Sequence, residues 1–140
     1  MINFKTTKFL SDEAKTIREE VFVQEQKFVN EFDEIDNKAY HIIMYKDDTP
    51  IACCRFYKND KIKDNYAAGR IAVRKEYRGK HLGKAILDEI ENEVKRLGGT
   101  SISLSAQLRV KKFYELSGYQ ASGDIYFDEY CEHIHMEKIL

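Results

Sequence analysis

Hydrophobic residues recur with two different periods along the chain, and the pattern predicts alternating strands and helices. Runs typical of strands, rich in β-branched and aromatic residues, cover 2–10, 39–45, 51–57, 66–73, 101–105 and 132–139. The polar segment Lys46–Pro50 separates the second run from the third. This spacing predicts an antiparallel hairpin.

Helical spacing of apolar residues predicts the elements between these strands. The strongest pattern covers 82–97 and is followed by Gly98 and Gly99, a typical stop signal. Weaker patterns predict a helix over 12–23 with Ser11 as its N-cap, and a short helix over 110–117. The acidic segment 24–37 is expected to form a short second helix followed by a loop.

The order of these elements predicts the fold class. Strands and helices mix without a linker or a composition break, which favours one α/β domain over residues 1–140. The sheet is expected to be mixed and mostly antiparallel, with helices flanking it. The long helix between the strands at 66–73 and 101–105 predicts a right-handed crossover.

Composition excludes several classes of protein. The chain has 140 residues, 43% hydrophobic and 34% charged, with a net charge of −1, which argues against disorder and against a general nucleic-acid binder. Its longest apolar stretch is far shorter than the roughly 20 residues of a membrane span, and the start lacks the pattern of a secretory signal. Three cysteines, two of them adjacent at Cys53 and Cys54, favour a reducing, cytoplasmic location.

A basic segment with glycines, from Gly69 to Lys84, joins a predicted strand to the longest helix. The first N–H groups of a helix are unpaired, and glycine lets the backbone approach a bulky anion. The segment therefore suits a phosphate-bearing ligand, with a solvated basic turn as the alternative. Because neither the P-loop nor the dinucleotide-binding pattern fits, ATP hydrolysis and nicotinamide chemistry lose their main support.

Two motifs give the chain a family resemblance. The segment Arg78–Gly83 resembles the R/Q-x-x-G-x-G/A signature of the GNAT superfamily of acyl-CoA-dependent N-acyltransferases, and Gln107–Tyr119 is similar to a second GNAT motif. The segments 18–26 and 133–138 resemble a bacterial branch of small acetyltransferases that includes glyphosate N-acetyltransferase-like proteins. The resemblance covers nearly the whole chain and implies the GNAT fold and acetyl-CoA as cosubstrate.

Three positions depart from the family pattern. His81 replaces the first glycine of the signature, Gln107 replaces the common asparagine, and Val110 replaces an alanine. Histidine tolerates a positive φ better than most residues, so the turn is expected to survive with looser binding of the cosubstrate.

The resemblance also implies a binding site for acetyl-CoA. The backbone of Ile71, Ala72 and Val73 would line the pantetheine arm like an added strand. Gln107 and Phe113 would flank its thiol end. The N–H groups that would hold the diphosphate belong to Arg78, Gly79, Lys80, His81, Leu82, Gly83 and Lys84.

Two residues are candidates for proton transfer. Tyr114 matches the general-acid tyrosine of the family, and a phenol with a pKa near 10 carries its proton at neutral pH. A tyrosine that only packs in the core is the alternative. His133 matches a histidine that glyphosate-acetylating relatives use as the base, with a surface histidine as the alternative and Glu25 as a rival base.

The last predicted strand also invites a metal hypothesis. Cys131, His133 and His135 share one face of a regular strand, while Ile134 and Met136 face the core. Three alternate positions on one strand crowd poorly around a tetrahedral ion, so no metal is expected.

The acceptor site is the least specified part. Arg18, Arg70 and Arg109 are candidates to clamp an acidic amine, although each suits an ordinary surface cation as well; Glu25 and His41 are candidates for the same cleft. The reaction expected is acetyl transfer to a primary amine by direct attack, with a small molecule favoured. A protein N-terminus or lysine, a non-catalytic acyl-CoA binder and a basic nucleic-acid module are the alternatives, and a homodimer stays open.

Overall fold

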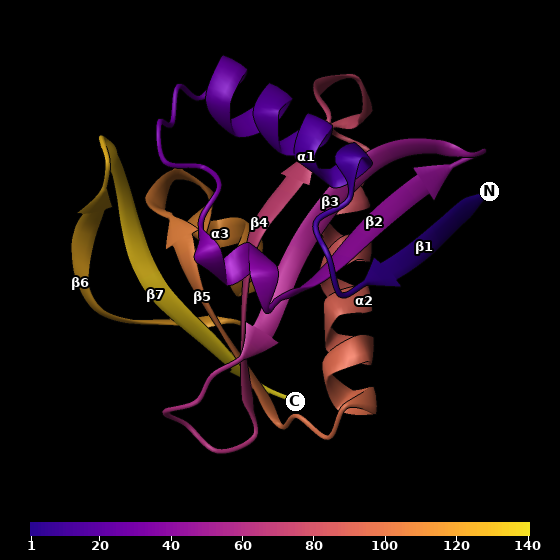
Figure 1. Ribbon diagram of the computed structural model, residues 1–140. Helices are drawn as coiled ribbons and strands as arrows, with labels where there is room; N and C mark the ends of the chain where they lie inside the picture. Colours follow the sequence, from indigo (N-terminus) through magenta and orange to yellow (C-terminus); the bar gives the residue numbers. More distant parts are fainter.

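One mixed sheet organises the molecule. In the computed structural model, which describes residues 1–140, seven strands lie in the order β1-β2-β3-β4-β5-β7-β6 (Figure 1). Their bounds are β1 Ile2–Thr7, β2 Tyr40–Lys46, β3 Thr49–Lys58, β4 Asn65–Val73, β5 Ser101–Gln107, β6 Gln120–Asp128 and β7 Cys131–Ile139. Only β4 and β5 run parallel, and every other neighbouring pair is antiparallel, as the sequence predicts.

Helices cover both faces of this sheet. Their bounds are α1 Asp12–Arg18, α2 Leu82–Arg96 and α3 Lys111–Leu116. In Figure 1, α1 lies in front of the sheet and α2 behind it. The apolar stripe of α2 packs with α3 on a core that includes Ile134 and Met136, whereas α1 covers a smaller core that contains Ile17 and Cys53. The apolar pair of β7 therefore faces the core, as expected.

The first helix changes its geometry in the middle. The Oγ of Ser11 accepts a hydrogen bond from the Ala14 N–H at 3.2 Å, which fixes the start of α1. After Arg18 the chain continues as a π-helix, η1 (Glu19–Glu25). The helix predicted over 12–23 is therefore present, but its second half is wound more widely than an α-helix.

The segment 24–37 differs from the prediction. Its loop comes first, and the short helix follows as a 3₁₀ turn, η2 (Glu34–Asn37). Asp33 and Asp36 form a capping box there, which explains the late start. Two further 3₁₀ turns are η3 (Lys75–Tyr77) and η4 (Leu108–Val110).

The hydrophobic pattern predicts no separate range for strand β6, because its residues are mostly polar and exposed. It lies at one edge of the sheet, pairs only with β7, and is exposed over most of its length. A register shift between Ser122 and Tyr126 bends it. Pairing with β7, rather than burial, therefore defines this strand.

The two parallel strands diverge along their length. β4 and β5 pair only from Asn65–Ala68 to Ser101–Leu104. Beyond these residues β4 stays paired with β3 and β5 with β7, so one backbone edge of Gly69–Val73 lacks a partner strand. Arg70 lies at the divergence with φ of 51°, in a bulge of β4 opposite the register shift in β3. This opening positions the site described below. No helix of the structure is long and apolar enough to span a membrane.

Candidate active site

A cavity of about 530 Å³ passes through the sheet where β4 and β5 diverge. Phe113 and Tyr114 of α3 line it from the side of α2, and Asn30 and His133 line it from the side of α1. The free edge of β4 forms one wall. The arrangement joins the two faces of the sheet through one opening.

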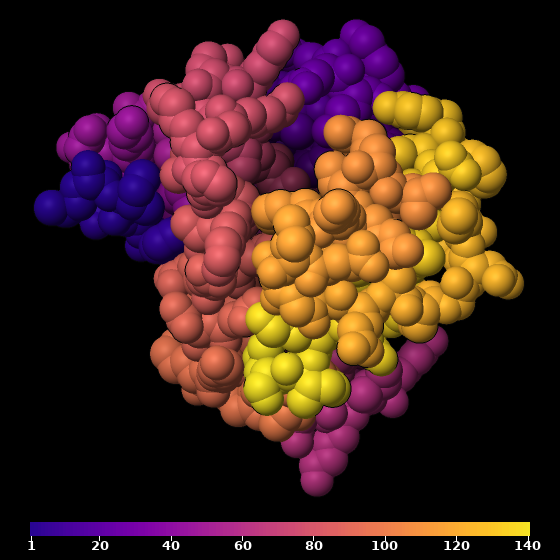
Figure 2. Space-filling model, turned by 180° about the vertical axis from the view of Figure 1, so that it is seen from behind, coloured from indigo at the N-terminus to yellow at the C-terminus, as the bar shows by residue number.

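A second cavity, of about 490 Å³, lies outside the start of α2. On the face shown in Figure 2, it opens between the start of α2 and α3. Val73, Gly83 and Phe113 line both cavities, so the two adjoin. Together they form a cleft that is lined by residues from the start of α2 to the centre of the sheet.

The turn that enters α2 has the conformation that the sequence predicts. His81 lies at φ of 60° and Gly79 at φ of 79°, both left-handed. His81 makes no capping hydrogen bond through its side chain, and the first turn of α2 carries no acidic residue. The first turn of the helix, which borders the second cavity, therefore has N–H groups without a side-chain partner.

Gly83 sits where a side chain would meet the cavity wall. A Cβ at this position would lie 3.1 Å from Cζ of Phe113, closer than an ordinary contact. Glycine at 83 therefore lets the Phe113 ring pack directly on the first turn of α2, and this contact shapes the junction of the two cavities.

Arg78, which lines the second cavity, forms an ion pair with Glu25, which lines none of the cavities. The Arg78 guanidinium donates to both Glu25 carboxylate oxygens at 2.6 and 2.7 Å and to the Val73 carbonyl at 2.9 Å. Hydrogen bonding from Arg78 lowers the pKa of Glu25 below its ordinary value. The Arg78 N–H points to the Lys75 carbonyl at 3.4 Å, so of the segment Arg78–Lys84 it is the least free to meet a phosphate.

Two of the residues predicted to bind the cosubstrate, Ala72 and Lys80, line neither cavity. The Ala72 side chain is buried in the core under α1, so only its backbone belongs to the β4 edge. The ammonium of Lys80 lies over the Tyr77 ring, 5.8 Å from its centroid.

Tyr114 is buried but not sealed. It is 9% exposed, packs edge-on against Phe113 and Tyr119, and lines the first cavity. Burial raises the pKa of its hydroxyl to about 12. The Tyr114 hydroxyl has no hydrogen-bond partner in the chain. Only two side-chain atoms are both fully enclosed and without a partner, Arg55 Nε and Tyr119 Oη, so the Tyr114 hydroxyl is not fully enclosed. A protonated hydroxyl is thus accessible from the cavity.

His133 is not a surface histidine. Its ring is 6% exposed and stacks on Tyr126 with centroids 6.1 Å apart. Nδ1 lies 3.0 Å from the Cys131 carbonyl, and because a carbonyl only accepts, this nitrogen carries the proton of the neutral ring. Nε2 is left as the lone-pair nitrogen, and His133 lines the cavity.

Gln107 is fixed by two polar neighbours at the end of β5. Its Nε2 donates to Gln26 Oε1 at 2.8 Å, and its Oε1 accepts from Arg109 Nε at 2.9 Å. All three side chains line the first cavity. Of the three arginines predicted for the acceptor site, Arg18 and Arg70 pair with carboxylates, whereas Arg109 has no carboxylate partner.

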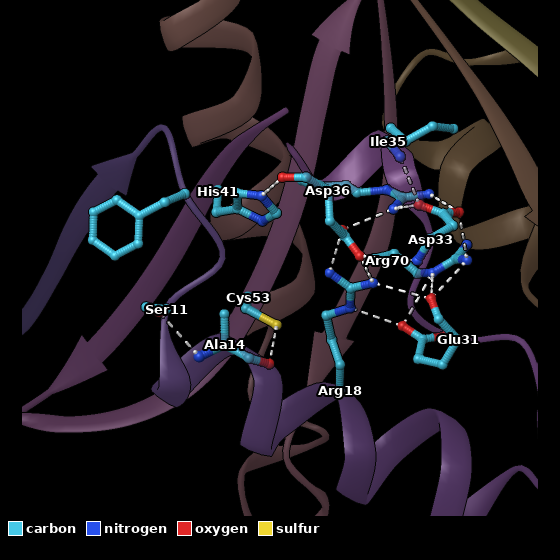
Figure 3. A network of polar contacts seen from close by, with 12 residues as sticks. Ser11, Ala14, Arg18, Glu31, Asp33, Ile35, Asp36, His41, Cys53 and Arg70 are labelled. Atoms are coloured by element: carbon cyan, nitrogen blue, oxygen red, sulfur yellow. Dashed lines mark hydrogen bonds and ion pairs between the residues drawn. The ribbon is translucent and has the colours of Figure 1, made fainter. Parts of the chain in front are cut away.

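Arg18 and His41 lie outside the cleft, contrary to their proposed place in it. Arg18, 1% exposed, donates to Glu31 at 2.8 Å and to Asp36 at 2.7 Å (Figure 3). His41, also 1% exposed, hydrogen bonds through Nε2 to the Asp36 carbonyl. Burial of these groups required partners on η2 and its preceding loop, so they hold structure instead of facing a ligand.

Arg70 belongs both to this network of ion pairs around Arg18 and Glu31 and to the lining of the first cavity. Its guanidinium contacts Glu31 at 3.0 Å and, more weakly, Asp33 at 3.5 Å, while its side chain lines the cavity wall. Most of its hydrogen-bonding capacity is therefore used within the chain.

The chain also matches a known protein family over most of its length. The profile described as Acetyltransferase (GNAT) domain matches residues 7–140. The chain belongs to the GNAT acetyltransferase family. Members of this family are acyltransferases, and this GNAT domain shares their fold over nearly its whole length.

Individual relatives agree with that assignment. The chain is 32% identical to the uncharacterized N-acetyltransferase YjcF of Bacillus subtilis over 130 residues, which cover 90% of each protein. It matches the crystal structure of a candidate N-acetyltransferase from Lactobacillus plantarum with a TM-score of 0.90 and 26% identity, covering 99% of this chain and 98% of that one. A GNAT acetyltransferase from Elizabethkingia anophelis, solved with acetyl-CoA bound, shares the fold at 12% identity, with a TM-score of 0.78 and coverage of 99% and 98%.

The GNAT domain also has site residues that its sequence did not single out. Asn30, Asp128 and Glu129 line the first cavity, and the Tyr126 hydroxyl hydrogen bonds Ser105 beside His133. Asn30 comes from the loop after η1, whereas Tyr126, Asp128 and Glu129 come from the β6–β7 hairpin. Neither segment has a strong sequence pattern. The sequence signal that could have pointed to this hairpin is the acidic pair Asp128–Glu129, which lies between aromatic residues. The structure contains no cluster of three metal-ligating side chains.

Proposed function

We propose that this GNAT enzyme transfers an acetyl group from acetyl-CoA to a small primary amine by direct attack. The observation that carries the proposal is the cleft formed by the two adjoining cavities. It connects the start of α2, the free edge of β4, a buried tyrosine hydroxyl and a histidine lone pair.

The chain's own residues fit acetyl-CoA. The backbone at Gly79 and at 81–84 borders the second cavity, which supports binding of a diphosphate there, and the unpaired edge of Ile71–Val73 suits the amides of a pantetheine arm. Gln107 and Phe113 border the inner end of that path. The bound acetyl-CoA of the Elizabethkingia relative supports the same choice of cosubstrate, which supplies an activated acyl thioester.

Tyr114 is proposed as the general acid. A departing thiolate needs a proton, and the Tyr114 hydroxyl holds one because burial raises its pKa to about 12. The absence of a partner within the chain leaves its O–H free to donate into the cavity.

His133 is proposed as the base. An amine with an ordinary pKa of about 10.4 is neutral in about one molecule per 2,500 at pH 7, so a proton must be removed before attack. The Cys131 carbonyl holds the Nδ1 proton, which positions Nε2 to accept the proton from the amine. Glu25 is a weaker candidate because Arg78 already occupies its carboxylate.

The remaining assignments also stand as proposals. Arg109 and Arg70 stay candidates for contact with the acceptor, whereas Arg18 and His41 do not because they are enclosed in the network. Three free cysteines, two of them fully buried, support a cytoplasmic location. One catalytic domain over 1–140 fits the single sheet, and the glyphosate-like branch and a homodimer stay predictions.

A thiol-release assay tests the proposal. Acetyl-CoA is incubated with a panel of small primary amines, and free CoA is measured with a thiol reagent. Tyr114→Phe is expected to lower kcat by roughly 100-fold, the scale of general acid catalysis, while CoA affinity in calorimetry stays within about twofold. Tyr119→Phe is the matched control, because this buried tyrosine packs against Tyr114 but lines neither cavity of the cleft.

Two results would contradict the assignment. Wild-type turnover rates in Tyr114→Phe would remove the proposed acid. Acetylation of a lysine peptide but of no small amine would replace the substrate class with a protein acceptor.

A further inference from the structure

A third cavity, of about 310 Å³, reaches His133 without passing α2 or α3. It shares Arg70, Asp128 and His133 with the first cavity, so the two meet at the proposed base. Its lining is mostly polar, with side chains such as Asn59 and Ser105. It is therefore a second approach to His133, separate from the path that suits acetyl-CoA.

The carboxylates around this meeting point differ in what they contact. Glu31 pairs with Arg18 at 2.8 Å, and Asp33 pairs with Arg55 at 2.7 Å. Glu129 accepts the backbone N–H groups of residues 29 and 30 at 2.8 and 2.9 Å. These three carboxylates are satisfied within the chain.

Asp128 is the exception. Its side chain is exposed, forms no ion pair or side-chain hydrogen bond, and lines both the first and the third cavity. The arginines of the third cavity, Arg55 and Arg70, are already paired with carboxylates. Arg109, which lacks a carboxylate partner, lines only the first cavity. The second approach to His133 thus holds one uncompensated carboxylate and no uncompensated arginine or lysine.

The hairpin places this carboxylate at a defined spacing from His133. Asp128 is paired with Cys131, and Tyr126 with His133, so Asp128 and His133 are diagonal neighbours. The Cα atoms of such neighbours in an antiparallel pair lie about 7–8 Å apart, and their side chains share one face of the hairpin. The hairpin is also anchored, because the ring of Tyr130 stacks on Phe28 with centroids 5.3 Å apart.

We propose that Asp128 binds a second, non-reacting cationic group of the acceptor, so that the enzyme prefers short diamines over monoamines of the same length. The inference rests on the proposed function. The reacting amine would lie at Nε2 of His133 and lose its proton there. The far ammonium would stay charged against Asp128.

Three acceptors with four carbons each test this proposal: butylamine, 1,4-diaminobutane and 4-aminobutanoate, whose far ends are neutral, cationic and anionic. Wild-type enzyme is expected to use the diamine with a kcat/KM about tenfold above that of butylamine, and 4-aminobutanoate least well. Asp128→Asn is expected to raise KM for the diamine about tenfold and to leave KM for butylamine within about twofold. Asp124→Asn, a neighbouring exposed aspartate that lines none of the three cavities, is the matched control and is expected to behave as wild type.

Binding is measured in parallel by calorimetry with the CoA-saturated protein. If Asp128→Asn leaves the preference and the affinity for the diamine unchanged, or if 4-aminobutanoate is the best acceptor, the Asp128 proposal is overturned. If no amine releases CoA, yet the diamine binds wild type and loses affinity in Asp128→Asn, the proposed function fails and the cation site stands.

Discussion

Two neighbouring tyrosines show how position decides the chemistry of a residue. Tyr114 and Tyr119 pack edge-on with centroids 5.9 Å apart, and burial raises the pKa of both hydroxyls. Only Tyr114 borders the cleft; the hydroxyl of Tyr119 is enclosed without a partner. A protonated phenol alone does not make a general acid, and access to the substrate separates the two.

Gly83 is a second residue whose role depends on one contact. Replacement by alanine places a Cβ 3.1 Å from Phe113, so the ring must shift by a few tenths of an ångström. We expect Gly83→Ala to weaken CoA binding about tenfold, which corresponds to about 1.4 kcal/mol, and to change the free energy of unfolding by less than about 1 kcal/mol. Calorimetry and urea unfolding measure the two quantities.

The control for Gly83 is a double-mutant cycle. Phe113→Leu shortens the side chain that the new Cβ meets, so the two substitutions together are expected to cost less than their sum. Strict additivity would show that Gly83 acts on the ligand directly and not through Phe113.

At the scale of elements, an ion network joins α1 and the segment after it to β3 and β4. Arg18, Arg55 and Arg70 alternate with Glu31, Asp33 and Asp36, and each ion pair crosses from one element to another. Figure 3 shows Arg18 and Arg70 with these three carboxylates. Burial raises the pKa of Glu31 in spite of its arginine partners. The network fixes the loop that forms one wall of the cleft.

Asp36 makes this network sensitive to acid. Burial opposes its ionisation, but hydrogen bonds from Arg18 and Arg55 outweigh burial and hold its pKa at about 2, below the ordinary 3.8. A lowered pKa adds stability that is complete above pH 3.8 and is lost as pH falls toward 2. The loss from this group is expected to be about 2 kcal/mol.

Urea unfolding from pH 6 to pH 2.5 measures this effect. Asp36→Asn is expected to cost about 3–5 kcal/mol at pH 6, because two buried arginines lose a partner, and to cost less as pH falls. Asp60→Asn, at an exposed position in the β3–β4 turn, serves as the control with a small, constant difference. A cost for Asp36→Asn that did not change with pH would contradict the assigned pKa.

At the scale of the whole molecule, the divergence of two parallel strands creates the site. The residues that meet there come from the loop after η1, from β4, α2, β5 and α3, and from the β6–β7 hairpin. No element contains the site alone. A ligand that spans the cleft should therefore stabilise the fold as a unit.

Ligand-dependent melting tests that expectation. CoA at 100 times its Kd is expected to raise the free energy of unfolding by about 2.7 kcal/mol. Pantetheine at the same concentration, which lacks the diphosphate for the start of α2, is expected to add less than about 1 kcal/mol because its occupancy is lower. Equal stabilisation by the two ligands would show that the turn at 79–84 does not hold the diphosphate.

The sequence by itself determined the elements that depend on local contacts or on a regular hydrophobic pattern. The apolar stripe of 82–97 specified α2, Ser11 specified the start of α1, and the alternation in 66–73 and 132–139 specified two central strands. The motifs at 78–83 and 107–119 together indicated the family, which the match over residues 7–140 confirms, and the turn at His81 kept its left-handed conformation. Each of these features depends on residues close together in the chain.

Only the tertiary structure decided the features that depend on partners distant in sequence. Strand β6 exists through its pairing with β7, Arg18 and His41 are enclosed because η2 covers them, and Asp128 stands apart because its acidic neighbours are paired elsewhere. A sequence lists the charged groups but not their distances, and the energy of a buried or paired charge depends on those distances. For that reason the fold and the family followed from the chain, whereas the acceptor side of the site required the folded molecule.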